Sequence, residues 1–86
     1  MRFNYKEDFK DPILDVLSEQ GGKAKLKDIY NLVWSKYGEY LGDPYWHEKV
    51  DKDLRWRDYI NRCRYDVLIP AGLIRKDSKH GTWELK

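Results

Sequence analysis

The segment from about Leu54 to Ile69 constrains the fold of this chain most strongly. Its apolar residues recur at helical spacing, and they are Trp56, Ile60, Cys63 and Val67. Side chains at i, i+4, i+7 and i+11 share one face of an α-helix, so the segment is predicted to be a helix that packs on a core. It should begin near Asp53 and end at Pro70, because proline cannot continue a regular helix.

A first helix is predicted after residue 10. Asp11 should cap its N-terminus, and Pro12 is tolerated in the first turn because its missing amide hydrogen is not needed there. Phe9 is placed to fold back on that turn as a hydrophobic staple. The pair at residues 21–22, two glycines, should end the helix.

A second helix is predicted from about Lys27 to Tyr37. Its apolar positions follow the i, i+3, i+4, i+7, i+8 pattern, and they are Leu26, Ile29, Tyr30, Val33, Trp34 and Tyr37. Residues 23–26 before it are interpreted as a connector or a very short strand. Residues 38–52 after it form a long irregular stretch with three aromatics, which is either a functional loop or a packed loop whose aromatics cap the core.

The C-terminal segment predicts a hairpin. Leu73–Lys76 and Thr82–Leu85 are expected to be strands, joined by a turn in which Gly81 adopts a positive φ. Three helices followed by such a hairpin is the order of a winged helix-turn-helix. The predicted fold class is therefore mainly α with some β, a single winged-helix domain over residues 1–86, with a two-stranded C-terminal wing.

Size and charge agree with one small domain. The chain has 86 residues and a formal net charge of +2, but residues 52–86 carry nine Lys or Arg against five Asp or Glu. A basic C-terminal part favours a polyanion as partner. The single cysteine excludes an internal disulfide and favours a reducing compartment, and no apolar run could span a membrane, so a cytoplasmic location is expected.

The third helix carries the predicted binding surface. When its apolar face lies on the core, polar side chains point outward, with Arg55 on the flank and Lys52 close by; the outward residues are Arg57, Asp58, Asn61, Arg62, Arg64 and Tyr65. In helix-turn-helix proteins this face enters the DNA major groove, where Arg pairs with guanine and Asn with adenine. The alternative is an ordinary solvated helix face, whose arginines pair with nearby aspartates.

The predicted wing adds basic residues to this surface. Lys76, Lys79 and His80 surround the turn and are predicted to reach a phosphate or the minor groove. The alternative is a turn that is polar for no functional reason. Outside these two clusters we find no zinc-type spacing, no glycine-rich phosphate loop and no nucleophile with a partner histidine, so no catalytic residue, metal or cofactor is expected.

Three stretches of the sequence resemble a known family. They are Tyr5 to Leu17; Trp56 to Arg64 followed by Ala71-Gly72-Leu73-Ile74; and His80-Gly81-Thr82-Trp83-Glu84-Leu85. In these stretches the chain resembles the N-terminal winged-helix domain of Mrr-type restriction proteins. The spacing from Arg64 to Gly72 is one residue longer than in that family, so the end of the third helix is expected to be irregular.

The resemblance implies a non-catalytic module that binds double-stranded DNA and senses modified or foreign DNA in a restriction system. A homodimer, or a fused or associated nuclease domain, would be its further partners. The alternative function is a winged helix that binds protein, such as a phage-type inhibitor or a dimerising adaptor. The aromatics that would serve it are Tyr40, Tyr45, Trp46 and Tyr65.

Overall fold

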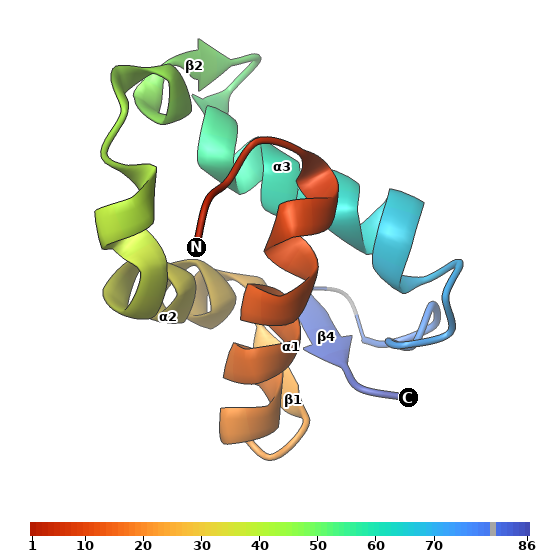
Figure 1. The fold of residues 1–86 in the computed structure, drawn as a ribbon. Helices are drawn as coiled ribbons and strands as arrows, with labels where there is room; N and C mark the ends of the chain where they lie inside the picture. The colour runs from red at the N-terminus through yellow and green to blue at the C-terminus, as the bar shows by residue number, and fades with distance from the viewer. Residues whose placement is uncertain (80) are drawn as a thin grey trace.

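A computed structural model describes residues 1–79 and 81–86 (Figure 1). Within this part, the chain forms three α-helices, α1 (Lys10–Glu19), α2 (Leu26–Tyr37) and α3 (Arg55–Cys63), with short antiparallel strands between and after them. The predicted mixture of three helices and a little β-structure is confirmed. No helix of the described residues is long and apolar enough to cross a membrane.

The first helix begins at Lys10, one residue before the predicted Asp11 cap, and an additional turn precedes it. A 3₁₀ turn, η1 (Lys6–Phe9), runs directly into α1, so Phe9 and not Asp11 precedes the helix, and the predicted Asp11 cap is wrong. Asp8 supplies the capping carboxylate, because it accepts hydrogen bonds from the amides of Asn4 and Tyr5 at 2.8 and 2.7 Å. This earlier turn brings Phe9 into the core, fully buried.

The two glycines after α1 end it as predicted. Gly21 has a φ of +78°, and the amide of Gly22 donates to the carbonyl of Leu17 at 2.8 Å. This bond closes the last turn, and the left-handed conformation it needs is open to glycine at little cost.

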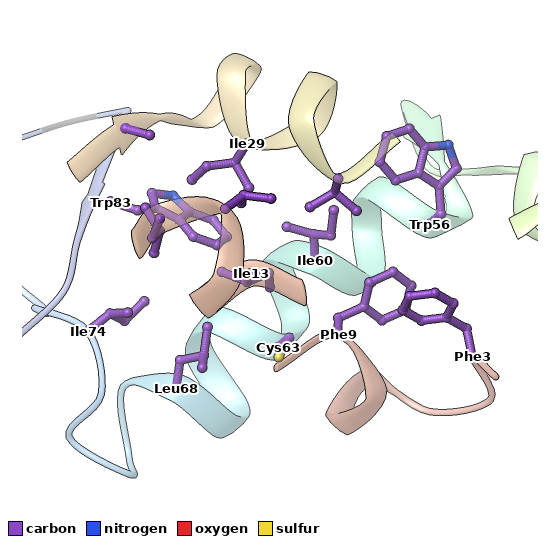
Figure 2. Close-up of a cluster of buried hydrophobic side chains, with 14 of the residues drawn as sticks. Phe3, Phe9, Ile13, Ile29, Trp56, Ile60, Cys63, Leu68, Ile74 and Trp83 are labelled. Atoms are coloured by element: carbon purple, nitrogen blue, oxygen red, sulfur yellow. The ribbon is translucent and has the colours of Figure 1, made fainter. Parts of the chain in front are cut away.

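The core lies where the three helices meet, and Figure 2 shows it as one cluster. Each helix contributes one face at the expected spacing. The fully or almost fully buried side chains are Phe9, Ile13, Val16, Leu17, Ile29, Val33, Leu41, Trp46, Trp56, Ile60, Cys63, Leu68, Ile74 and Trp83. The predicted apolar face of the third helix is thus confirmed at its first three positions.

The end of the third helix is irregular, as predicted from the extra residue between Arg64 and Gly72. After Cys63 the chain widens into one π-helical turn, Arg64–Leu68, and the amide of Ile69 donates to the carbonyl of Arg64 at 2.9 Å. A π turn holds one extra residue. Leu68 therefore takes the fully buried place predicted for Val67, which is only partly buried.

The predicted C-terminal wing is present only in part. Strand β4 (Thr82–Glu84) pairs antiparallel with β1 (Lys23–Lys25), which is the short strand predicted before the second helix. Leu73–Lys76 is not assigned as a strand, but Ile74 makes an antiparallel β-bridge to Leu85, and the amide of Arg75 donates to the carbonyl of Glu84 at 2.8 Å. An isolated two-stranded hairpin is only marginally stable in water. The β1–β4 pair is stabilised because its buried residues pack on the helices.

Residues 38–52 are more ordered than an open loop. They form two 3₁₀ turns, η2 (Gly38–Leu41) and η3 (Pro44–His47), and then β2 (Lys49–Val50), which pairs with β3 (Asp53–Leu54). Trp46 is 4% exposed and packs edge-on against Phe9. The interpretation that aromatics of this stretch cap the core holds for Trp46, while Tyr40 and Tyr45 are exposed.

Candidate nucleic-acid interface

Arg55, at the start of α3, is engaged within the protein. Its Nη1 donates to the Glu48 carboxylate at 2.6 Å and to the Tyr45 carbonyl at 2.9 Å. Its guanidinium also lies 4.0 Å from the centroid of the Tyr45 ring. These contacts fasten η3 to the beginning of α3 and leave Arg55 little freedom to reach a ligand.

Arg57 lies between α3 and α2. Its Nη1 is 3.5 Å from the carboxylate of Asp53, and its guanidinium lies 5.1 Å from the centroid of the Tyr30 ring. Its Nε is buried and has no hydrogen-bond partner among the described residues. Arg57 is therefore only loosely paired, and part of its hydrogen-bonding capacity is unused.

Asn61 forms a bridge between the same two helices. Its side-chain amide nitrogen donates to the phenolic oxygen of Tyr30 at 2.6 Å and to the carbonyl of Arg57 at 3.1 Å. Burial raises the pKa of Tyr30, so its hydroxyl stays neutral. Both amide hydrogens of Asn61 are thus used, and a bidentate contact with adenine would require the bond to Tyr30 to break.

Arg62 projects from the exposed face of α3. Its Nε is 2.6 Å from the Asp58 carboxylate one turn earlier, and its side chain remains 58% exposed. Asp58 raises the pKa of Arg62. Because an exposed i,i+4 pair contributes only about 0.3–0.5 kcal/mol, an incoming phosphate could replace Asp58 at small cost.

Arg64 and Tyr65 follow in the π-helical turn. The Arg64 guanidinium lies 5.0 Å from the centroid of the Trp83 ring and 5.3 Å from that of Tyr65. No carboxylate of the described residues lies within ion-pair distance of Arg64, and its Nε lacks a hydrogen-bond partner there. Tyr65 is 61% exposed beside it.

The remaining predicted site residues occupy two ends of the molecule. Lys52 lies in the turn between β2 and β3, next to the start of α3, whereas Lys76 and Lys79 follow its far end (Figure 1). All three are exposed. His80 lies outside the described residues. The nine predicted residues that the structure describes therefore extend from the turn before α3 to the segment after it, and their role in binding stays a prediction.

A second basic group was missed by the sequence reasoning. Lys23, Lys25 and Lys27 are exposed on β1 and the first turn of α2, and together they line a surface hollow of about 500 Å³ with Gln20, Ala24, Asp28 and Thr82. The available signal was the alternation Lys-Ala-Lys-Leu-Lys. It was interpreted as a connector or a very short strand and not as a basic surface, because its pairing with β4 is not apparent locally.

Exposed aromatics form the other notable feature. Between α2 and the start of α3 is a hollow of about 180 Å³, lined by Tyr30, Asn31, Trp34, His47, Leu54, Trp56 and Arg57. Trp34 is 43% exposed, although it was predicted on the apolar stripe. Of the four aromatics proposed for protein contact, Trp46 is buried and the other three are 41–61% exposed.

Comparison of the chain with protein-family models, with curated protein sequences and with solved structures finds no match. The resemblance to Mrr-type proteins therefore rests on the sequence stretches alone. In the described part of the chain, no three His, Cys, Asp or Glu side chains lie together as a metal site would require.

Proposed function

We propose that this chain is a winged-helix domain that binds double-stranded DNA. The observation that carries the proposal is the distribution of cations that lack a carboxylate partner among the described residues. Six of these cations lie on β1, in the first turn of α2, at the far end of α3 and in the segment before β4, and they are Lys23, Lys25, Lys27, Arg64, Lys76 and Lys79. The other cations without such a partner lie outside these segments, and they are Arg2, Lys10, Lys49, Lys52 and Lys86. Exposed, unpaired cations are what a phosphate backbone attracts.

The arrangement of the elements supports the winged-helix part of the proposal. The strand between α1 and α2 pairs with the C-terminal strand, and Ile74 bridges to Leu85 on the other side of that strand. In this proposal these pairings form a small three-part sheet, and Trp83 of β4 lies against Arg64, just after the end of α3. In this proposal the segment 75–79 is the reduced counterpart of a wing.

In this proposal the exposed face of α3 approaches the major groove. Arg62 and Tyr65 are its most exposed predicted contacts, and Arg64 flanks them. An α-helix fits the major groove by size, and Arg and Tyr side chains suit contacts with bases and phosphates. From the resemblance to Mrr-type proteins we further propose that the DNA target contains a modified base. The associated partner would be a nuclease domain or a second copy of the chain.

A fluorescence-anisotropy titration with labelled duplexes tests the proposal. Plain and methylated duplexes should be titrated at four salt concentrations. With four to six phosphate contacts, the logarithm of the affinity should fall against the logarithm of salt with a slope of about −4 to −5. A preference for the methylated duplex would support modification sensing. No duplex binding even at low salt would reject DNA binding.

A specific observation also favours the alternative of protein binding. Arg55, Arg57 and Arg62 each contact a carboxylate, and Tyr40, Tyr45 and Tyr65 are exposed. Tyrosines of this kind anchor protein interfaces. Sedimentation analysis of the chain alone would support a dimerising adaptor if Tyr65→Ala dissociates a dimer, and a monomer at all concentrations would argue against it.

A further inference from the structure

We propose that the hollow between α2 and the start of α3 binds one unstacked nucleobase, with guanine preferred. This inference deepens the DNA-binding function proposed above, and it rests on that function where the base belongs to a duplex. It assigns a ligand to the exposed aromatic surface beside the predicted contact residues of α3.

Aromatic rings form much of the wall of the hollow. Trp34 of α2 is 43% exposed, and its ring centroid lies 5.6 Å from that of Trp56, which is seen at the edge of the buried cluster in Figure 2. Tyr30 meets the Trp56 ring edge-on at 5.9 Å, and His47 meets the Trp34 ring edge-on at 5.4 Å. Aromatic side chains bind nucleobases by stacking, because every base has a π-face.

The size of the hollow limits its ligand to a single ring system. The hollow has a volume of about 180 Å³, whereas sites for drug-sized ligands have about 300–1,000 Å³. A whole cofactor or a dinucleotide is therefore too large. One nucleobase or one aromatic side chain has a suitable size.

Arg57, on the wall of the hollow, has hydrogen-bonding capacity that the protein leaves unused. Its Nε is buried and has no partner among the described residues, although buried donors are normally satisfied. Asp53 contacts the Nη1 atom of Arg57 at 3.5 Å. Because that contact is long, the guanidinium loses little when it turns its other edge, Nε with Nη2, toward a ligand in the hollow.

The guanidinium of Arg57 also selects the chemistry of the ring. A methylated ammonium ligand would be repelled by its charge, and a hydrocarbon ring would leave Nε unpaired. Guanine presents two acceptors, O6 and N7, that match two parallel N–H donors of one arginine. Adenine presents one acceptor and one donor at the corresponding positions, so guanine is the base that Arg57 favours.

The hollow adjoins the side of α3 that carries Arg64. Arg57, Asn61 and Arg64 follow one another at i, i+4 and i+7, so their side chains lie on one side of the helix. Asn61 donates to the hydroxyl of Tyr30 in the wall of the hollow at 2.6 Å, and Arg64 has the other buried Nε without a partner among the described residues. A duplex bound along this side would present a base to the hollow and a phosphate to Arg64.

Free nucleotides test the hollow without a duplex. Guanosine monophosphate should shift the indole N–H signals of Trp34 and Trp56 saturably in NMR spectra of the chain, and adenosine monophosphate should bind several-fold more weakly. Trp34→Leu, followed at Trp56, should weaken the binding of guanosine monophosphate by about ten-fold or more. The matched control, Tyr40→Leu, removes a similarly exposed aromatic from outside the wall and should leave that binding unchanged.

Arg57→Lys separates the role of the guanidinium from that of its charge. Lysine keeps the positive charge but lacks the two parallel donors, so the preference for guanosine over adenosine monophosphate should disappear. A preference that survives in this variant would overturn the role of Arg57. Ribose 5-phosphate, which has no base, should give no saturable shift, and shifts equal to those of guanosine monophosphate would overturn the nucleobase assignment.

A pair of duplexes tests the base within DNA. One duplex is fully paired, and the other has the same sequence with one mismatched guanine, whose unstacking costs less. The chain should bind the mismatched duplex about ten-fold more tightly. Trp34→Leu should remove this preference and leave the affinity for the paired duplex and its salt slope unchanged. Circular dichroism checks that each variant is folded.

The outcomes separate this site from the proposed function. Binding of the paired duplex, with no nucleotide binding and no mismatch preference, would overturn the nucleobase site while DNA binding stands. Saturable binding of guanosine monophosphate with no duplex binding would overturn the DNA-binding function and identify a free nucleotide as the ligand of the hollow. Binding of neither nucleotide nor duplex would overturn both.

Discussion

The guanidinium of Arg64, in the turn after α3, lies 5.0 Å from the ring centroid of Trp83 in β4. Trp83 is 1% exposed and belongs to the core, so Arg64 packs against the ring of a core residue. Its position is determined by an aromatic ring and not by an acid. The charge of Arg64 is therefore held at one place on the surface while remaining available to an anion.

Arg64→Ala should weaken duplex binding. We expect a loss of about 1–3 kcal/mol if Arg64 contacts a base, or a salt slope smaller by about 1 if it contacts a phosphate. Anisotropy titrations at several salt concentrations separate the two. Since a cation–π contact near the surface contributes about 0.5–1 kcal/mol, the unfolding midpoint of the variant should be measured as well.

Arg55→Ala serves as the contrasting variant for that prediction. It removes the contacts with Glu48 and Tyr45 that join η3 to α3, so it should lower stability. Its salt slope should match that of the wild type. An equal loss of slope in the two variants would contradict a specific role for Arg64.

Leu68→Ala should destabilise the protein far more than Val67→Ala. Leu68 is fully buried because of the π-helical turn, and a buried leucine truncated to alanine costs about 2–5 kcal/mol. Val67 is only partly buried, so its truncation leaves a smaller cavity. Urea unfolding of both variants checks the order, and a regular α-helix through residue 68 would produce the reverse.

The effect of Gly38→Ala on the free energy of unfolding should depend on whether Trp34 is present. A Cβ at residue 38 would lie 3.1–3.2 Å from three atoms of the Trp34 indole, which is closer than ordinary contact. Gly38 has a φ of −59°, so alanine is otherwise allowed there and should stabilise by about 0.4–1 kcal/mol. We expect that gain in a Trp34→Ala background and its reduction or reversal in the wild type. A double-mutant cycle with no coupling would disprove the contact.

The buried thiol of Cys63 should make stability depend on pH at the alkaline end. Burial raises its pKa to about 12, whereas the unfolded thiol ionises near its usual value of about 8.5. The folded state then holds a proton that the unfolded state releases, so the stabilisation is complete below about pH 8.5 and is lost as pH rises toward 12.

Urea unfolding of the wild type and of Cys63→Ala measures this effect. The stability difference in favour of the wild type should shrink by about 2 kcal/mol between pH 7 and 10. The alanine variant provides the control for all other groups that titrate in this range. A difference that stays constant with pH would show that the thiol is not shielded.

Much of the helical structure was predictable because it follows from local periodicity. Trp56, Ile60 and Cys63 share a face in any α-helix, and Gly21 can take the left-handed conformation that ends α1. Even the irregular end of α3 was signalled by one extra residue before Gly72. That signal did not say where the residue would be inserted, so Val67 was placed where Leu68 lies.

The candidate site was only partly predictable, because it depends on contacts distant in sequence. Arg55 and Arg64 have the same chemistry and lie in the same arginine-rich segment. Which of them meets an acid depends on η3 packing against the start of α3 and on β4 lying beside its end. Nothing in the pattern of the segment distinguishes the two.

The sequence by itself determined the helices, their buried faces and most of their ends, since these depend on side chains within a few residues of one another. The tertiary structure decided that Thr82–Glu84 pairs with Lys23–Lys25, in addition to the contact that Ile74 and Leu85 make with the segment just before it. A strand takes the partner that lets it bury most apolar surface, and here Ala24 and Trp83 become buried together. That choice also placed three unpaired lysines beside the first turn of α2.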